Sequence, residues 1–179
     1  MAQVRGKFIT LTGALMSLYP EELAQADRAL FQKVKKHWHE LEPEGWYDTS
    51  LIGLFMDAYV KASPSKEKAL VTLGRKIYPT IKKTEHLPTF SNPLEFLKYE
   101  AEGFLAGHRG NDVKPRHFLR AQQGDVLVEA FAPGYNSKVN EGVFLGILEM
   151  CGVNNPKVVQ TKCQEKGDNT SEFHITWTY

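Results

Sequence analysis

The clearest change in the hydrophobic pattern lies in the last third of the chain. Residues 125–131 read DVLVEAF, a β-rich run that predicts a strand. Residues 139–151 form an apolar stretch that is followed by Gly152, and this pattern predicts a helix. Residues 157–165 and 171–178 are again β-rich, and the polar sequence EKGDNTS between them predicts a hairpin turn. The chain is therefore expected to end in an antiparallel sheet that carries one helix.

The earlier part of the chain follows mostly helical spacing. Residues 4–12 are predicted to form a short strand, and residues 20–41 a helix in which apolar side chains recur every three or four positions. Pro20 fits the first turn of that helix, where its missing N–H does no harm. A helix over 51–62 is expected after a cap within Asp48–Ser50, with its buried face formed by Leu51, Leu54, Phe55, Ala58 and Tyr59.

Two more helices precede the sheet. One begins with Ser63 as its cap and is expected to kink or end before Pro79. The other starts at Asn92-Pro93 and ends at Gly107 or Gly110. Helices followed by strands predict an α+β fold of one domain, residues 1–179, in which N-terminal helices pack on a C-terminal antiparallel sheet with one helix before the final hairpin. Its interior is predicted to contain Phe144, Leu145, Leu148, Val159, Phe173 and Ile175.

Composition narrows the classes of partner. The chain carries 22 basic and 21 acidic residues, so its net charge of +1 gives no basic surface for nucleic acid. No apolar run approaches the roughly 20 residues of a membrane span, and the start has no signal-peptide core. The cysteines, Cys151 and Cys163, are too few for a disulfide framework, which favours a reducing, cytoplasmic compartment.

No motif for catalysis stands out. The glycines do not have the spacing of a phosphate-binding loop, and no nucleophile elbow is present. The carboxylates include no pair whose context selects it for acid–base work. The sequence is therefore not expected to be an enzyme.

Residues 135–152, YNSKVNEGVFLGILEMCG, carry the main lead to function. They resemble the signature region of haem–nitric oxide/oxygen-binding (H-NOX) domains, in which a strand leads into a Tyr-x-Ser-x-Arg motif and an apolar helix with an FLGLIE-like core. Tyr135 and Ser137 match that motif, and Phe144–Glu149 match the helix core, whereas Val139 stands in place of the arginine. Residues 157–177 are also similar to the ends of 4-vinyl reductase-type domains, of the same superfamily as TRAPP vesicle-tethering subunits.

The resemblance implies a haem site, and the residues agree with it only in part. In H-NOX domains the Tyr, Ser and Arg side chains hold the haem propionates, and a histidine before the sheet binds the iron. His108 is the candidate iron ligand. Val139 offers no charge to a propionate, and Lys138 next to it points to the opposite side of an extended segment. Haem is thus a candidate cofactor, and the haem-free state is favoured.

Aromatic residues suggest where a ligand would bind. Phe96, Tyr99 and Phe104 share one predicted helix, and Phe131, Tyr135 and Phe144 surround the joint between strand and helix. If the two halves pack as in the superfamily, these residues and Ser137 would line a pocket between helices and sheet. The alternative is a plain hydrophobic core.

The functional hypothesis is a sensory domain that binds a small hydrophobic or haem-like ligand. It would pass a conformational change to a signalling partner protein or an output domain. A haem-free protein-interaction module, a tetrapyrrole reductase-like enzyme and a homodimeric assembly remain open alternatives.

Overall fold

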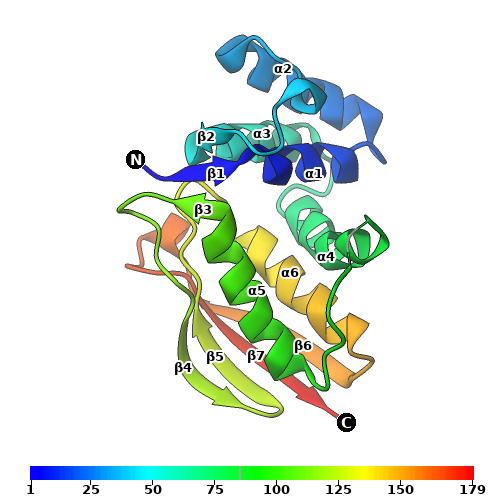
Figure 1. The fold of residues 1–179 in the computed structure, drawn as a ribbon, viewed down its shortest axis with the longest axis vertical. Coiled ribbons are helices and arrows are strands. Elements are labelled where there is room, and N and C mark those ends of the chain that lie inside the picture. Colours follow the sequence, from blue (N-terminus) through cyan, green and yellow to red (C-terminus); the bar gives the residue numbers. More distant parts are fainter. Residues whose placement is uncertain (85) are drawn as a thin grey trace.

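The computed structural model describes residues 1–84 and 86–179, and its helices lie above and beside an antiparallel sheet (Figure 1). The N-terminal elements are β1 (Gln3–Arg5), α1 (Gly6–Met16), α2 (Pro20–Val34), the short 3-10 helix η1 (Trp38–Glu40), β2 (Trp46–Asp48) and α3 (Thr49–Ala62). They are followed by α4 (Lys68–Thr84), α5 (Pro93–Gly107), β3 (His108–Arg109), β4 (His117–Gln122) and β5 (Asp125–Glu129). The chain ends with α6 (Lys138–Met150), β6 (Asn154–Lys162), the 3-10 helix η2 (Gln164–Lys166) and β7 (Glu172–Thr178).

The start of the chain differs from the prediction. A strand over 4–12 is wrong, because only Gln3–Arg5 is extended and α1 begins at Gly6. The buried side chains Ile9, Thr12 and Met16 recur every three or four residues, which is the spacing of a helix. Residues 43–50, PEGWYDTS, contain β2, and β1 pairs with both β2 and β3.

The helix predicted over 20–41 is shorter in the structure. It ends at Val34 because Lys35 adopts a left-handed conformation with φ 58°. Asp27 then fixes the following turn, since its carboxylate accepts a hydrogen bond from the Trp38 amide at 2.9 Å and contacts His37 Nδ1 at 2.6 Å. The chain thus reverses before the 3-10 helix at Trp38–Glu40.

Helices α3 and α5 begin where the caps predict, but α4 begins only at Lys68, and its predicted cap, Ser63, ends α3 instead. Asp48 accepts from the Ser50 amide at the start of α3, and Asn92 accepts from the Glu95 amide at the start of α5. Leu54, expected to be buried, is 37% exposed on the outer side of α3. An end before Pro79 is also wrong, since α4 continues through this proline to Thr84.

The C-terminal sheet and its helix confirm the prediction. The strands run antiparallel in the order β4-β5-β7-β6, and α6 packs on this sheet. Val159 is an exception, because it is 46% exposed although predicted to be buried, and Leu145 is only half-buried. The register explains this: Val158 pairs with the buried Ile175, so Val159, paired with His174, points to the opposite face. The edge strand β4 was not predicted, since its sequence HFLRAQ is largely polar and exposed.

Helices α4 and α6 cross with their backbones in contact. A Cβ atom at Gly142 would meet the carbonyl oxygen of Val71, and one at Gly146 would meet that of Arg75. On the other helix, a Cβ atom at Gly74 would meet the carbonyl oxygen of Val139. The glycines therefore set the close approach of these helices.

The buried side chains form two hydrophobic cores, and α4 and α6 contribute to both. The first core lies among α1, α2, α3 and the first half of α4, with Val139 from α6. The second lies between α5, α6 and the four-stranded sheet, with Tyr78 from α4. This arrangement is the predicted α+β architecture, and it leaves a boundary between the cores. None of the helices in the described ranges is both long and apolar enough to cross a membrane.

Candidate functional site

A cavity of about 460 Å³ lies at the boundary between the two cores. Its walls come from α1, α3 and α4 on one side and from α5, residues 132–135 and the first turns of α6 on the other. Most of the lining side chains are aliphatic or aromatic. Both its volume and its lining are typical of small-molecule sites.

The structure places the predicted pocket residues in different surroundings. Tyr99, Phe104, Tyr135 and His108 line the cavity. Phe96 and Phe144 are 2% and 1% exposed and belong to the second core, where Phe144 packs edge-on against Phe173. Phe131 lines a separate surface depression near Lys114, and Ser137 is outside both. Whether the cavity-lining residues bind a ligand stays a prediction.

His108 lies where α5 ends and the chain enters β3. Its side chain is 5% exposed and stacks on the Phe104 ring, with ring centroids 4.1 Å apart. Nδ1 lies 2.7 Å from the Phe104 carbonyl oxygen, and Nε2 lies 2.9 Å from the Tyr135 hydroxyl. Because a carbonyl only accepts, Nδ1 carries the proton and Nε2 accepts from Tyr135.

This environment keeps the imidazole neutral. Burial lowers the pKa of His108 to about 4, although the bond to the Phe104 carbonyl acts in the opposite direction. Burial also raises the pKa of the Tyr135 hydroxyl, so this group keeps its proton. The cavity therefore contains an uncharged, hydrogen-bonded His108–Tyr135 pair at neutral pH.

A buried ion pair on the same wall was not predicted from the sequence. Arg116 Nη2 lies 2.8 Å from Glu100 Oε1, and Arg116 Nε lies 3.3 Å from Oε2. The side chains of Arg116 and Glu100 are 3% and 6% exposed. Nη2 also donates to Asn140 Oδ1 at 3.2 Å, and the guanidinium carbon lies 4.1 Å from the centre of the Phe104 ring.

One end of this guanidinium is not satisfied. Arg116 Nη1 is buried and has no hydrogen-bond partner among the residues that the structure describes. A buried donor left without an acceptor costs about 1–3 kcal/mol, and more when the group is charged. Arg116 lines the cavity, so an acceptor placed there could satisfy it.

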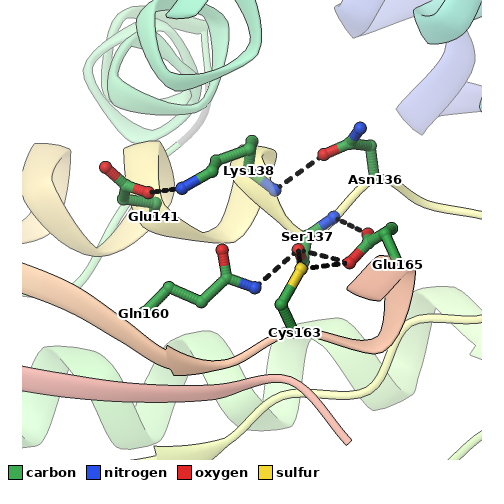
Figure 2. Close-up of polar contacts among 7 residues, drawn as sticks. All are labelled: Asn136, Ser137, Lys138, Glu141, Gln160, Cys163 and Glu165. Carbon is green, nitrogen blue, oxygen red and sulfur yellow. Dashed lines mark hydrogen bonds and ion pairs between the residues drawn. The ribbon is translucent and has the colours of Figure 1, made fainter. Parts of the chain in front are cut away.

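The motif serine faces the terminal hairpin, as Figure 2 shows. The Ser137 amide and hydroxyl donate to the Glu165 carboxylate at 2.5 and 2.8 Å. Gln160 Nε2 donates to the Ser137 hydroxyl at 2.8 Å, and the Cys163 thiol donates to Glu165 at 3.1 Å. Burial by itself would raise the pKa of the Glu165 carboxyl, yet the hydrogen bonds from Ser137 and Cys163 lower it. Ser137 therefore ties the start of α6 to the β6–β7 hairpin.

Known structures share this fold. The chain superposes on an Fe(II) unliganded H-NOX protein from K. algicida with a TM-score of 0.70 and 14% identity, covering 98% of this chain and 97% of that one. An H-NOX protein from S. oneidensis in the Fe(II)NO ligation state gives a TM-score of 0.63 at 10% identity, with coverage of 98% and 99%. A variant of T. Tengcongensis H-NOX gives 0.69 at 13% identity, with 98% of each chain covered.

No protein-family model matches the sequence, and no curated protein matches it either. The superpositions on solved structures nevertheless show that this chain has the fold of H-NOX domains. This extends to the whole chain a likeness that the sequence carried in its last third.

The residues around the cavity do not match a haem site of that type. His108 has the right tautomer for a metal ligand, but Tyr135 occupies its Nε2 lone pair. On the propionate side, Ser137 is committed to Glu165, and Val139 has no charge to offer. The Glu100 carboxylate also lines the cavity and would repel a propionate. Of the cations that line the cavity among the described residues, Arg116 is paired with Glu100 and Lys7 is exposed to solvent, so neither is a buried, unpaired anchor for a dianionic porphyrin.

Proposed function

We propose that this chain is a small-molecule sensory domain that binds an apolar ligand, without haem, in the cavity between its two cores. The observation that carries the proposal is the cavity itself, which occupies the boundary between the N-terminal helices and the sheet-bearing half. A protein-interaction module with a filled interior would not retain a space of this size. A partner protein or an output domain would respond to the conformational change that ligand binding causes.

The segment from Tyr135 to Val139 offers a route from the cavity to the surface. Tyr135 and Val139 line the cavity, whereas Ser137 between them bonds Glu165 and Gln160 of the terminal hairpin. A ligand that moves Tyr135 would therefore act on the attachment of the hairpin. For signalling, the ligand must bind one arrangement of this segment better than the other.

Binding is tested with N-phenylnaphthylamine, an uncharged dye that fluoresces in apolar sites. We expect saturable binding, together with a change in amide hydrogen exchange in the hairpin at residues 160–168. The matched variant is Ser137→Ala, whose side chain is outside the cavity. It should bind the dye as the parent does and lose the exchange response. Absence of saturable dye binding would refute the proposed function.

Haem is tested by titrating the protein with haemin. We expect the absorbance of free haemin to stay unchanged, because among the described lining residues Arg116 is already neutralised by Glu100 and Lys7 is exposed to solvent. A protein-dependent Soret band that disappears in His108→Ala would show instead that His108 binds the iron.

A further inference from the structure

The buried pair of Arg116 and Glu100 narrows the class of ligand, provided that the proposed function holds. Three of the five N–H donors of this guanidinium are used, two by Glu100 and one by Asn140. Nη1 alone lacks an acceptor among the described residues, and its side chain is 3% exposed. Water outside the protein is therefore no substitute for an acceptor in the cavity.

The position of the guanidinium is fixed from several sides. Its carbon lies 4.1 Å from the centre of the Phe104 ring and 6.0 Å from that of Phe144. Glu100 and Asn140 hold it at its edge. A planar donor held in this way is preorganised for one acceptor, because little side-chain freedom is lost when the bond forms.

The charges around the cavity decide what kind of acceptor fits. Glu100 already neutralises Arg116, and His108 is neutral because its pKa is lowered by burial. A carboxylate at Nη1 would come close to the Glu100 carboxylate in a site with little water to screen the repulsion. Lys7, at the exposed end of the lining, is too accessible to solvent to offset this.

The other polar pair of the cavity, His108 and Tyr135, is already hydrogen-bonded. Tyr135 donates its hydroxyl proton to His108, and His108 donates to the Phe104 carbonyl. The donors of both groups are already used, so this pair does not compete with Nη1 for an acceptor.

We infer that Arg116 recognises the ligand, and that the ligand is an uncharged, mostly apolar molecule with a hydrogen-bond-accepting oxygen such as a ketone, ester or amide carbonyl. The apolar body of the molecule contacts the aliphatic and aromatic walls, and its oxygen accepts from Nη1. Glu100 and Asn140 are positioning residues for Arg116.

The test uses three competitors of nearly equal size against bound N-phenylnaphthylamine: ethylnaphthalene, acetylnaphthalene and naphthoate. Acetylnaphthalene adds an uncharged acceptor to the apolar ring, and naphthoate adds a charged one. We expect acetylnaphthalene to displace the dye at about one tenth of the concentration that either of the others requires, as for one hydrogen bond to a charged donor.

The variant Arg116→Lys keeps a cation beside Glu100, but its single ammonium nitrogen leaves nothing in the place of Nη1. Measured against the dye affinity of the variant itself, the three competitors should fall within about twofold of each other, if the difference rests on one charge-assisted bond. The double variant Glu100→Gln/Arg116→Met removes both charges, so it leaves no buried ion unpaired, and it should show the same loss. Circular dichroism and thermal unfolding check that each variant is folded.

The outcomes separate this inference from the proposed function. If the dye does not bind the parent protein, the proposed function is refuted. If the dye binds and acetylnaphthalene has no advantage over ethylnaphthalene, the role of Arg116 is refuted while the function stands. If naphthoate is the strongest competitor, the ligand class is anionic and the argument from Glu100 is wrong.

Discussion

His108 should make the stability of this protein fall between neutral and mildly acidic pH. Its pKa is lowered by burial from 6.5 to about 4, so the folded protein keeps the imidazole neutral where the unfolded chain already takes up a proton. The contribution is full above pH 6.5 and is lost as the pH falls toward the folded pKa. A shift of this size corresponds to about 3 kcal/mol, at about 1.4 kcal/mol for each pKa unit.

The assay is urea unfolding of the parent and of His108→Gln at a series of pH values from 7.5 to 4.5. We expect the free energy of unfolding of the parent to fall more steeply over this range, by about 2–3 kcal/mol relative to the variant. His37, whose pKa is raised chiefly by its hydrogen bond to Asp27, titrates in both proteins, so its opposite contribution cancels in the difference. Parallel curves for the two proteins would refute the burial of a neutral imidazole, and so would an NMR titration of the His108 ring with an ordinary midpoint.

The remaining predictions concern packing. Gly142→Ala should lower the free energy of unfolding by at least about 2 kcal/mol, because its methyl group would meet the Val71 carbonyl at the α4–α6 crossing. Gly103→Ala, on the exposed side of α5 with no atom closer than 3.9 Å, should instead stabilise the protein by about 0.5–1 kcal/mol. Leu148→Ala should cost about 2–5 kcal/mol because Leu148 is fully buried, whereas Leu54→Ala should change stability by less than about 0.5 kcal/mol. Urea unfolding measures all four, and equal costs for either pair would contradict the packing described above.

Sequence pattern predicted the elements that follow a local rule. The hairpin β6–β7 has polar turn residues between β-rich runs, and α5 has Asn92 as its cap and Gly107 at its end. Where a rule depended on distant partners, the pattern failed. Residues 4–12 contain many residues that suit strands, yet they form α1 because Ile9 and Met16 reach the first core only from a helix. Likewise, one step of register decided that Val158 faces inward and Val159 outward.

In the candidate site too, some residues could be predicted from the sequence and others only from the tertiary structure. Tyr135 and His108 could be selected from the sequence, because a resemblance gave them a role and a spacing. No sequence pattern pointed to Arg116, because a basic residue in a loop before a strand is ordinarily solvated. Glu100 becomes its partner only through the packing of α5 against that loop. Phe144 and Tyr99 were both predicted as aromatic pocket residues, yet Phe144 lies in the second core and Tyr99 lines the cavity.

What the sequence determined by itself was the succession of β5, α6, β6 and β7 at the end of the chain, the strand-to-helix joint at Tyr135 and the missing charge at Val139. Those features depend on neighbours along the chain, so local propensity and spacing reveal them. The tertiary structure alone decided that Ser137 turns toward Glu165, that Tyr135 bonds His108 and that Nη1 of Arg116 is left without an acceptor among the described residues. Such contacts join residues far apart in the chain, and their geometry exists only once the two cores have packed against each other.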